Sequence, residues 1–335
     1  MRIHISNLYG LSGGSATAAA MQSVTKVASE FAKDVGMEIS IYRYPCEVDS
    51  ERELSKRLDG VISSVSVGDI VILQLPTWND TRFEEHLIQK LKVYKTTLIM
   101  FIHDVVPLQF DSGKEKLQRA VEMYNQADVL ILPSKNMYKR LVEAGLTVEK
   151  ICYQTLFDYV VDADMDRHAF LRKMIFTGSP KRFPFINEYH GTTPIDLYGL
   201  YKANPGANTV YQGQRMGTSL LLEMSKGGFG LVWAEDNQYE YYKMNLPFKV
   251  TTFLAAGIPL IIRKGIHIED YVVKHKVGFA VDSLSEADEI VQTITEEQYG
   301  RMLENVKKVQ FLITHGYYTR KVLVDAIVMA VEGSI

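Results

Sequence analysis

The chain has 335 residues, of which 47% are hydrophobic and 23% charged, which is ordinary for a globular protein. Its length exceeds that of most single hydrophobic cores and predicts two domains. The formal net charge of -3 argues against nucleic acid or an acidic membrane as partner. Cys46 and Cys152 are the only cysteines, which argues against a disulfide framework or a cysteine-based zinc site.

The first ten residues, MRIHISNLYG, lack the basic start and long apolar core of a signal peptide. No apolar run approaches the roughly 20 residues needed to span a bilayer. We therefore expect a cytoplasmic protein without a membrane span.

The first half of the chain alternates short apolar runs with helical patterns. We expect strands at 2–7, 39–44, 70–75, 97–102, 129–132 and 151–155. We expect helices at 16–35, 51–65, 81–94, 117–126 and 136–144. Continuous apolar strands that alternate with helices predict a parallel sheet covered on both faces, a Rossmann-like unit.

The second half repeats this organisation after a polar, irregular stretch at 158–172, which we interpret as a linker. Strands are expected at 173–177, 195–198, 209–211, 231–233, 260–262 and 279–281, and helix from Thr295 onward with a break at Gly316. The predicted domains are 1–158 and 173–318, and we expect the helix at 319–335 to pack back on the first domain.

The stretch 226–265 organises the second domain, because it reads as strand, Tyr-rich loop, helix, glycine and strand. In a parallel sheet, ligands bind at the carboxyl ends of the strands, where helix N-termini point. Lys249 falls in the first turn of the expected helix, where a cation is mildly unfavourable unless an anion is bound. This position indicates a phosphate site.

A glycine-rich loop, Gly13-Gly14-Ser15, follows the first strand, and a helix opens at Ser15 or Ala16. The loop is either a simple tight turn or a substrate or phosphate site at a helix N-terminus. It is not GxGxxG, so a dinucleotide site is disfavoured.

Five runs carry a resemblance to a known family: ELSKRLDG at 53–60, PTWN at 76–79, FIHDVVPL at 101–108, MSKGGFGLVW at 224–233 and FLAAGIP at 253–259. They resemble the glucosyltransferase that performs the second glycosylation step on serine-rich-repeat adhesins of streptococci and lactobacilli. The resemblance spans nearly the whole chain, and PTWN and FIHDVVP are its most specific runs.

This resemblance implies an α/β protein of the GT-B class, with two Rossmann-like domains and a cleft between them. It implies transfer of glucose from UDP-glucose to O-linked N-acetylglucosamine on the adhesin, by a homotetramer. The first domain would bind the glycoprotein acceptor and the second the nucleotide sugar.

The resemblance also implies a diphosphate site at two cationic residues. Arg182 matches the arginine of the family's G-x-P-x-R-F block, here 178–183 with Gly178 and Ser179 at its start, and Lys249 matches the family's diphosphate lysine. A guanidinium can bind phosphate oxygens through two hydrogen bonds. The alternative is that these are ordinary surface charges.

Further donor-site candidates lie near these two. Tyr211 and Gln214 bound a strand-end loop that can face the base, but the family can carry Tyr where this chain has Gln214, so stacking on uracil is not assigned there. Phe248, Thr251 and Thr252 are on the same helix opening as Lys249, with core packing as the alternative.

His103 and Asp104 follow a strand and precede a Pro-terminated loop at the edge of the first domain. The carboxylate of Asp104 is hard to bury without a partner. At this place it could take the proton from the acceptor hydroxyl as general base. His103 is either a catalytic partner or a core histidine satisfied by hydrogen bonds. Trp78 either stacks on a sugar or packs, and packing is favoured.

One departure concerns a carboxylate pair. Many retaining GT-B enzymes place a Glu before GFG and another eight residues later, but here Gly227 holds the first position and Glu235 the second. The stereochemistry therefore stays open. No DxD run is present, and we expect no metal or other cofactor, with cationic side chains neutralising the diphosphate.

Two alternatives remain at this stage. The donor could be UDP-GlcNAc or UDP-galactose, since no residue specifies the hydroxyl pattern. The chain could instead be a non-catalytic GT-B-like subunit that binds the glycoprotein, which the joint presence of Arg182 and Lys249 disfavours.

Overall fold

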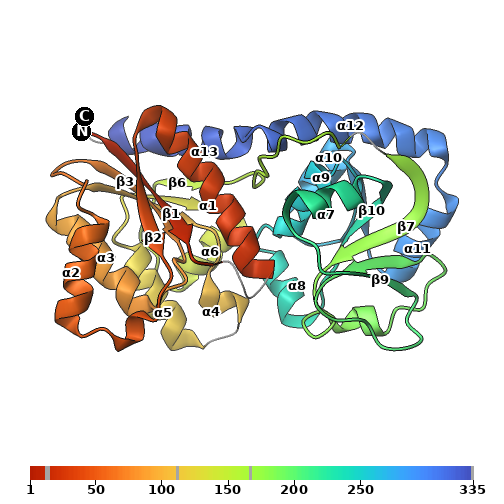
Figure 1. Cartoon of the computed structure of the whole chain (residues 1–335), viewed down its shortest axis with the longest axis horizontal. Helices are drawn as coiled ribbons and strands as arrows, with labels where there is room; N and C mark the ends of the chain where they lie inside the picture. The colour runs from red at the N-terminus through yellow and green to blue at the C-terminus, as the bar shows by residue number, and fades with distance from the viewer. Residues whose placement is uncertain (12–15, 111–112, 166–167, 333–335) are drawn as a thin grey trace. The chain divides into compact units, whose positions relative to one another are not determined.

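A computed structural model describes residues 1–11, 16–110, 113–165 and 168–332, without the side chains of 16–23 and 32. The chain forms two compact units (Figure 1). Unit 1 comprises Met1–Thr155 and Tyr317–Ile335, and unit 2 comprises Leu156–Gly316.

The described part of unit 1 contains a six-stranded parallel sheet in the order β2-β1-β3-β4-β5-β6. The strands are β1 (Ile3–Tyr9), β2 (Met37–Tyr42), β3 (Ile70–Leu75), β4 (Thr97–Ile102), β5 (Val129–Leu132) and β6 (Ile151–Tyr153). The helices are α1 (Ala16–Val35), α2 (Glu51–Val61), α3 (Thr81–Val93), α4 (Val106–Gln109), α5 (Lys114–Tyr124), α6 (Lys135–Glu143) and α13 (Tyr317–Glu332), with a 3₁₀ turn at Cys46–Val48.

Three helices of unit 1, α2, α3 and α6, start at side chains that satisfy free backbone N–H groups. Ser50 and Glu53 form a reciprocal capping box at α2. Asp80 caps α3 by accepting from the N–H of Phe83 at 2.7 Å, and Ser134 caps α6 in the same way.

The last helix, α13, belongs to the core of unit 1 although unit 2 precedes it in the chain (blue in Figure 1). Its buried side chains Leu323 and Ala326 share one hydrophobic cluster with Ile5, Phe101 and Ile131 of the sheet. This helix therefore covers part of one face of the sheet.

The described part of unit 2 contains a second six-stranded parallel sheet, in the order β12-β11-β10-β7-β8-β9. The strands are β7 (Ala169–Thr177), β8 (Ile195–Tyr198), β9 (Thr209–Gly213), β10 (Gly227–Val232), β11 (Leu260–Arg263) and β12 (Gly278–Val281). The helices are α7 (Gly217–Met224), α8 (Asp236–Tyr242), α9 (Phe248–Ala255), α10 (Glu269–His275), α11 (Leu284–Thr293) and α12 (Glu296–Thr314), with a 3₁₀ turn at Pro184–Asn187.

Two of the interpretations made from sequence are corrected here. The stretch 158–172 is not a linker throughout, because β7 begins at Ala169 and pairs with β10. The Tyr-rich loop contains α8, which anchors through the buried rings of Tyr241 and Tyr242. Residues 169–172 of β7 are all exposed or partly exposed, and α8 buries only Tyr241 and Tyr242, so neither segment shows an apolar pattern.

Candidate functional site

Each sheet has a point where the strand order reverses. In unit 1 it lies between β1 and β3, and in unit 2 between β7 and β10. Loops diverge from the carboxyl ends of the strands at such a point, and ligands of open parallel sheets bind there. In unit 2 the two loops that leave this point carry Arg182, after β7, and Gln238, on α8 after β10.

Lys249 is the most unusual charged residue of unit 2. Its Nζ atom is buried and has no hydrogen-bond partner in the part of the chain that the structure describes. It lies 4.1 Å from the ring centre of Phe176 and 3.6 Å from that of Phe183. Burial, and secondly the charge of Arg182, hold the pKa of Lys249 well below its usual range. An arriving anion would stabilise the charged form, and the flexible stem can carry the ammonium out from between the rings.

Arg182 is tied to the other loop of the same switch point. Its Nε and Nη2 donate to Oε1 of Gln238 at 3.2 and 2.8 Å. Its guanidinium carbon lies 5.6 Å from the ring centre of Phe183. Arg182 and Lys249 are thus close enough for one charge to depress the pKa of the other. Two neighbouring cations repel one another, and an anion that binds to both offsets this repulsion, so the pair can form an anion site.

The turn before Arg182 is closed by backbone bonds. The carbonyl oxygen of Ser179 accepts from the N–H groups of Arg182 and Phe183 at 2.9 and 3.0 Å. A side chain at Gly178 would come within 3.0 Å of the Phe176 ring, and one at Gly199 would come within 2.3 Å of the Gly178 carbonyl. Glycine at both positions lets the backbone pack closely against these neighbours and lets a ligand approach the turn closely.

The predicted base-facing residues lie at the end of β9. Tyr211 donates from its hydroxyl to the carbonyl of Gly199 at 3.0 Å, and its ring lies under the ammonium of Lys202 at 5.7 Å. Gln214 is exposed, with its Nε2 4.0 Å from Sδ of Met216. Tyr211 is therefore fixed, whereas Gln214 faces solvent.

The other predicted residues of α9 are engaged with the protein itself. Thr251 donates to the carbonyl of Phe157 at 3.0 Å, and Thr252 to that of Phe248 at 3.0 Å. The Phe248 ring stacks on Tyr159 with centres 5.8 Å apart. These contacts fix the orientation of α9, so that the three residues position Lys249.

In unit 1, His103 is buried directly after β4. Its Nε2 is 2.8 Å from Oε1 of Gln74 and its ring centre is 4.1 Å from that of Phe101. Burial lowers the pKa of His103 to about 3, so the ring is neutral at physiological pH. Asp104, the next residue, is only partly buried.

A second carboxyl group lies in the same part of unit 1 and was not predicted from sequence. Glu84 of α3 accepts from the N–H and the hydroxyl of Thr77 at 2.6 and 2.8 Å. Burial raises the pKa of Glu84 to about 7. Burial also raises the pKa of Tyr124, with smaller contributions from Glu84 and Asp104, so both carboxyl groups lie in its surroundings. A glutamate in a first helical turn is common, so its place in the sequence does not indicate burial.

The predicted glycine-rich loop of unit 1 cannot be placed. Gly14 and Ser15 lie outside the described residues, and Ala16 is the first described residue of α1. The role of the glycine-rich loop as a ligand site therefore stays a prediction.

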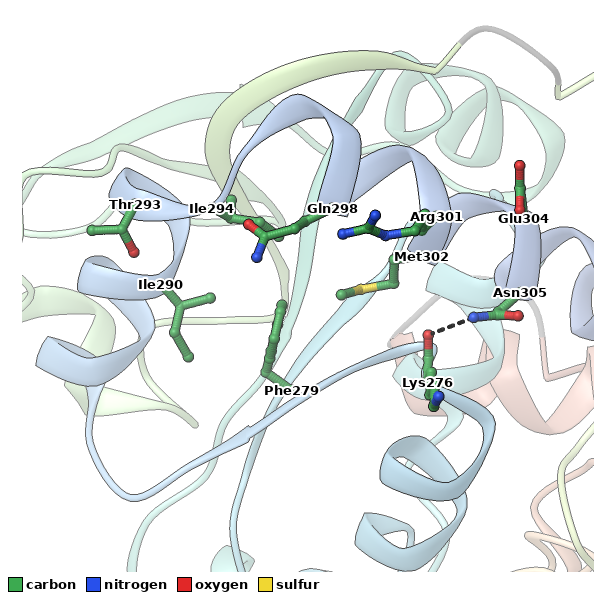
Figure 2. A pocket seen from close by; sticks show the side chains of 10 residues that line it. All are labelled: Lys276, Phe279, Ile290, Thr293, Ile294, Gln298, Arg301, Met302, Glu304 and Asn305. Atoms are coloured by element: carbon green, nitrogen blue, oxygen red, sulfur yellow. Dashed lines mark hydrogen bonds between the residues drawn. The ribbon is translucent and has the colours of Figure 1, made fainter.

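A groove of about 650 Å³ lies elsewhere in unit 2, between β12, α11 and α12 (Figure 2). Its apolar wall is formed by Phe279, Ile290, Ile294 and Met302. Phe279 is the second residue of β12, so the groove lies at the amino end of this strand. Arg182 follows the carboxyl end of its strand, and the groove is therefore separate from the cationic pair.

Two features are absent from the described ranges. No group of three or more His, Cys, Asp or Glu side chains there could hold a metal ion. None of the helices found there combines the length and hydrophobicity that crossing a bilayer requires.

Comparison with protein families gives matches along both halves of the chain. Residues 2–156 match the N-terminal domain, and residues 174–326 the C-terminal domain, of the family described as Glucosyltransferase 3-like. The chain belongs to this family. The resemblance stated from sequence is confirmed, and the chain is a glycosyltransferase.

Two curated relatives align end to end with this chain. Glucosyltransferase 3 of Streptococcus gordonii is 43% identical over 332 residues, which cover 98% of each chain. Glucosyltransferase 3 of Streptococcus parasanguinis is 37% identical over 331 residues, which cover 99% of each.

Solved structures support the fold. The Anabaena protein HepE in complex with UDP superimposes with a TM-score of 0.64 at 12% identity, covering 98% of this chain and 99% of that one. The lipopolysaccharide outer core galactosyltransferase WaaB gives 0.58 at 11% identity, covering 99% of both chains. The predicted GT-B class, with two Rossmann-like α/β units, is confirmed.

Proposed function

We propose that this glycosyltransferase moves glucose from UDP-glucose to N-acetylglucosamine that is O-linked to a serine-rich-repeat adhesin. The observation that carries the donor half is the buried Nζ atom of Lys249, which has no hydrogen-bond partner among the described residues and lies near Arg182 at the switch point of unit 2. The glucosyltransferase name of both streptococcal relatives supports glucose, and UDP bound to HepE supports the nucleotide.

In this proposal the diphosphate is neutralised by protein groups alone. Lys249 lies in the first turn of the eight-residue helix α9, whose free N–H groups add partial positive charge. Arg182 supplies a planar donor that fits two phosphate oxygens. The cations stabilise UDP as the bond from the sugar to the phosphate oxygen breaks. No metal is required, and EDTA should leave the activity intact.

Unit 1 is proposed to bind the acceptor, with Asp104 as general base. Asp104 would accept the proton of the acceptor hydroxyl as its oxygen bonds to the anomeric carbon of glucose. His103, which follows β4, is neutral and buried, so we assign it a positioning role through its bond to Gln74 of β3. We further propose a homotetramer, on the basis of the resemblance, and a location in the cytoplasm. Light scattering and cell fractionation measure these two properties.

The test compares Lys249→Met with wild type by thermal shift and by glucose transfer. Methionine refills the space between the two phenyl rings without a charge, and sulfur packs well against aromatic rings. We expect UDP, but not NAD, to raise the melting temperature of the wild type. We expect Lys249→Met to lose about tenfold to a hundredfold in UDP affinity, because a charge-assisted hydrogen bond is worth about 1.5–3 kcal/mol.

Two further variants make the result specific. Lys226→Met removes an exposed, ion-paired lysine of the same unit and should bind UDP normally. Asp104→Asn should bind UDP normally yet transfer glucose at least about a hundredfold more slowly. Normal UDP affinity in Lys249→Met would place the diphosphate elsewhere, and normal transfer by Asp104→Asn would remove it as the base.

A further inference from the structure

The turn from Pro76 to Asp80 carries two unusual features on one residue, Trp78. Its φ angle is +59°, in the left-handed region, where a bulky side chain is a genuine outlier. Its indole Nε1 is buried and finds no hydrogen-bond partner within the described ranges. Buried indole N–H groups are normally paired, so the exception requires an explanation.

Hydrogen bonds on both sides hold Trp78 in this conformation. Before it, Thr77 is fixed by its two bonds to Glu84. After it, Asn79 donates from its own N–H to the Thr77 hydroxyl at 3.3 Å, and its side chain accepts from the N–H of Tyr44 at 3.2 Å. Strain at one residue persists only where its surroundings determine it, and such places cluster at ligand sites.

Trp78 also lies at a place in the sheet where ligands of open parallel sheets bind. It follows β3, which is one side of the switch point of unit 1. The neighbouring strand β4 pairs with β3 up to Leu75 and Ile102, and the N–H of His103 donates to the carbonyl of Leu75 at 2.8 Å. Trp78 and Asp104 therefore follow adjacent strands at the same edge of the sheet.

We propose that Trp78 binds the sugar of the acceptor: its indole ring packs against the apolar face of the pyranose, and its N–H donates to one of the sugar's oxygens. The N–H is shielded from solvent, so the side chain must turn to reach the sugar. Because the N–H makes no hydrogen bond with described residues, turning breaks none. This inference rests on the proposed function, in which unit 1 binds the acceptor.

The chain has two tryptophans, which permits a direct binding measurement. Trp233 lies in unit 2 and its Nε1 is 3.4 Å from Glu235. In the Trp233→Phe variant, Trp78 is the sole source of indole fluorescence. Titration with a synthetic serine-rich peptide that carries O-linked N-acetylglucosamine should shift this emission to saturation, and the unmodified peptide should not. A variant that transfers glucose to the glycopeptide without any change in emission would overturn the inference.

The second measurement removes the N–H and keeps an aromatic ring. Trp78→Phe should raise KM for the glycopeptide by about three- to tenfold, the loss expected for one neutral hydrogen bond. Its response to UDP should be normal, and its melting temperature should be unchanged or higher, because an unpartnered buried donor is gone. Trp233→Phe, the matched control, should keep the wild-type KM. An unchanged KM in Trp78→Phe, or a lower melting temperature with normal KM, would show a structural residue.

Failure of the proposed function gives a different result. If the wild type binds UDP but transfers nothing to the glycopeptide, the proposed acceptor is wrong. The Trp233→Phe protein is then titrated with a panel of methyl glycosides. A saturable change in Trp78 emission with one of them supports a sugar site at Trp78, and no change with any of them overturns it.

Discussion

At the scale of single residues, Lys249 of unit 2 and Glu84 of unit 1 are buried ionisable groups whose pKa values depart from their ordinary ones. Among the described residues, Lys249 has two phenyl rings and the cation Arg182 beside it and no hydrogen-bond partner for its Nζ atom, so burial and repulsion both disfavour its proton. Burial raises the pKa of Glu84, and the hydrogen bonds donated by Thr77 offset this only in part, so its carboxyl group holds its proton more tightly. Perturbed groups of this kind gather at functional sites.

Glu84 predicts a pH dependence of stability that one substitution removes. Its pKa is raised from 4.5 to about 7 in the folded chain, so the folded state binds the proton more tightly than the unfolded state. The stabilisation is complete below about pH 4.5 and is lost as pH rises through about 7. We expect wild type to lose about 2–3 kcal/mol relative to Glu84→Gln between pH 5 and pH 8, measured by urea unfolding. Glutamine can still accept from Thr77.

The control for this experiment is Glu53→Gln. Glu53 is an exposed member of the α2 capping box, a position where glutamine also serves. Its pH profile should therefore run close to that of wild type above pH 5. A Glu84→Gln variant whose stability keeps the wild-type slope from pH 5 to pH 8 would show that Glu84 ionises normally.

At the scale of elements, β10 explains why the chain lacks one carboxylate of the retaining GT-B pattern. Gly227 begins this strand with a φ of +124°, and a Cβ there would lie 2.0 Å from the carbonyl oxygen of Ala169 in β7. The register between β10 and β7 shifts between Gly227 and Phe229. No side chain fits at Gly227 without separating the two strands. Gly227 is also at the amino end of β10, whereas Glu235 follows its carboxyl end, so a carboxylate at position 227 would lie too far away to pair with Glu235.

Gly227→Ala is accordingly predicted to destabilise unit 2. The clash is with backbone, and the φ angle also disfavours alanine, so we expect a loss above about 2 kcal/mol. Gly300→Ala is the matched control: it lies within α12 with open space around its Cα, and alanine there should stabilise by about 0.5–1 kcal/mol. Thermal denaturation of the two variants measures both effects. Equal melting temperatures would mean that β7 and β10 can separate freely at this point.

Which elements could be predicted from sequence follows from how many of their residues are buried. The limits of β3, β4, β5 and β8 agree with those expected, because each is short and mostly apolar. The helix α8 was missed because its sequence, DNQYEYY, offers no apolar stripe. The surroundings of Lys249 were also beyond prediction, since Phe176 and Phe183 lie more than 60 residues earlier in the chain.

At the scale of the whole molecule, the chain does not divide into two consecutive domains. It leaves unit 1 after Thr155, forms all of unit 2 and returns to unit 1 at Tyr317. The predicted helix at 319–335 corresponds to α13, whose Val322, Leu323 and Ala326 are nearly inaccessible to solvent. Unit 2 is made of one continuous segment, whereas unit 1 needs both ends of the chain.

This connectivity predicts that residues 1–155 do not form a stable unit by themselves. Without α13, the sheet side chains Ile5, Phe101 and Ile131 lose their cover, and each buried aliphatic or aromatic side chain exposed costs about 1.5–3 kcal/mol. For these three side chains the sum is about 4.5–9 kcal/mol, which is comparable with the whole stability of a typical domain, about 5–15 kcal/mol. Joining 317–335 to 155 through a Gly/Ser linker should restore cooperative thermal unfolding and dispersed NMR signals, and 156–316 should show both without any addition.

Within the linked fragment, Leu323→Ala should cost about 2–5 kcal/mol, and Val324→Ala, at an exposed neighbour, less than about 0.5 kcal/mol. Cooperative unfolding of 1–155 at the temperature of the linked fragment would show that α13 contributes nothing to the core.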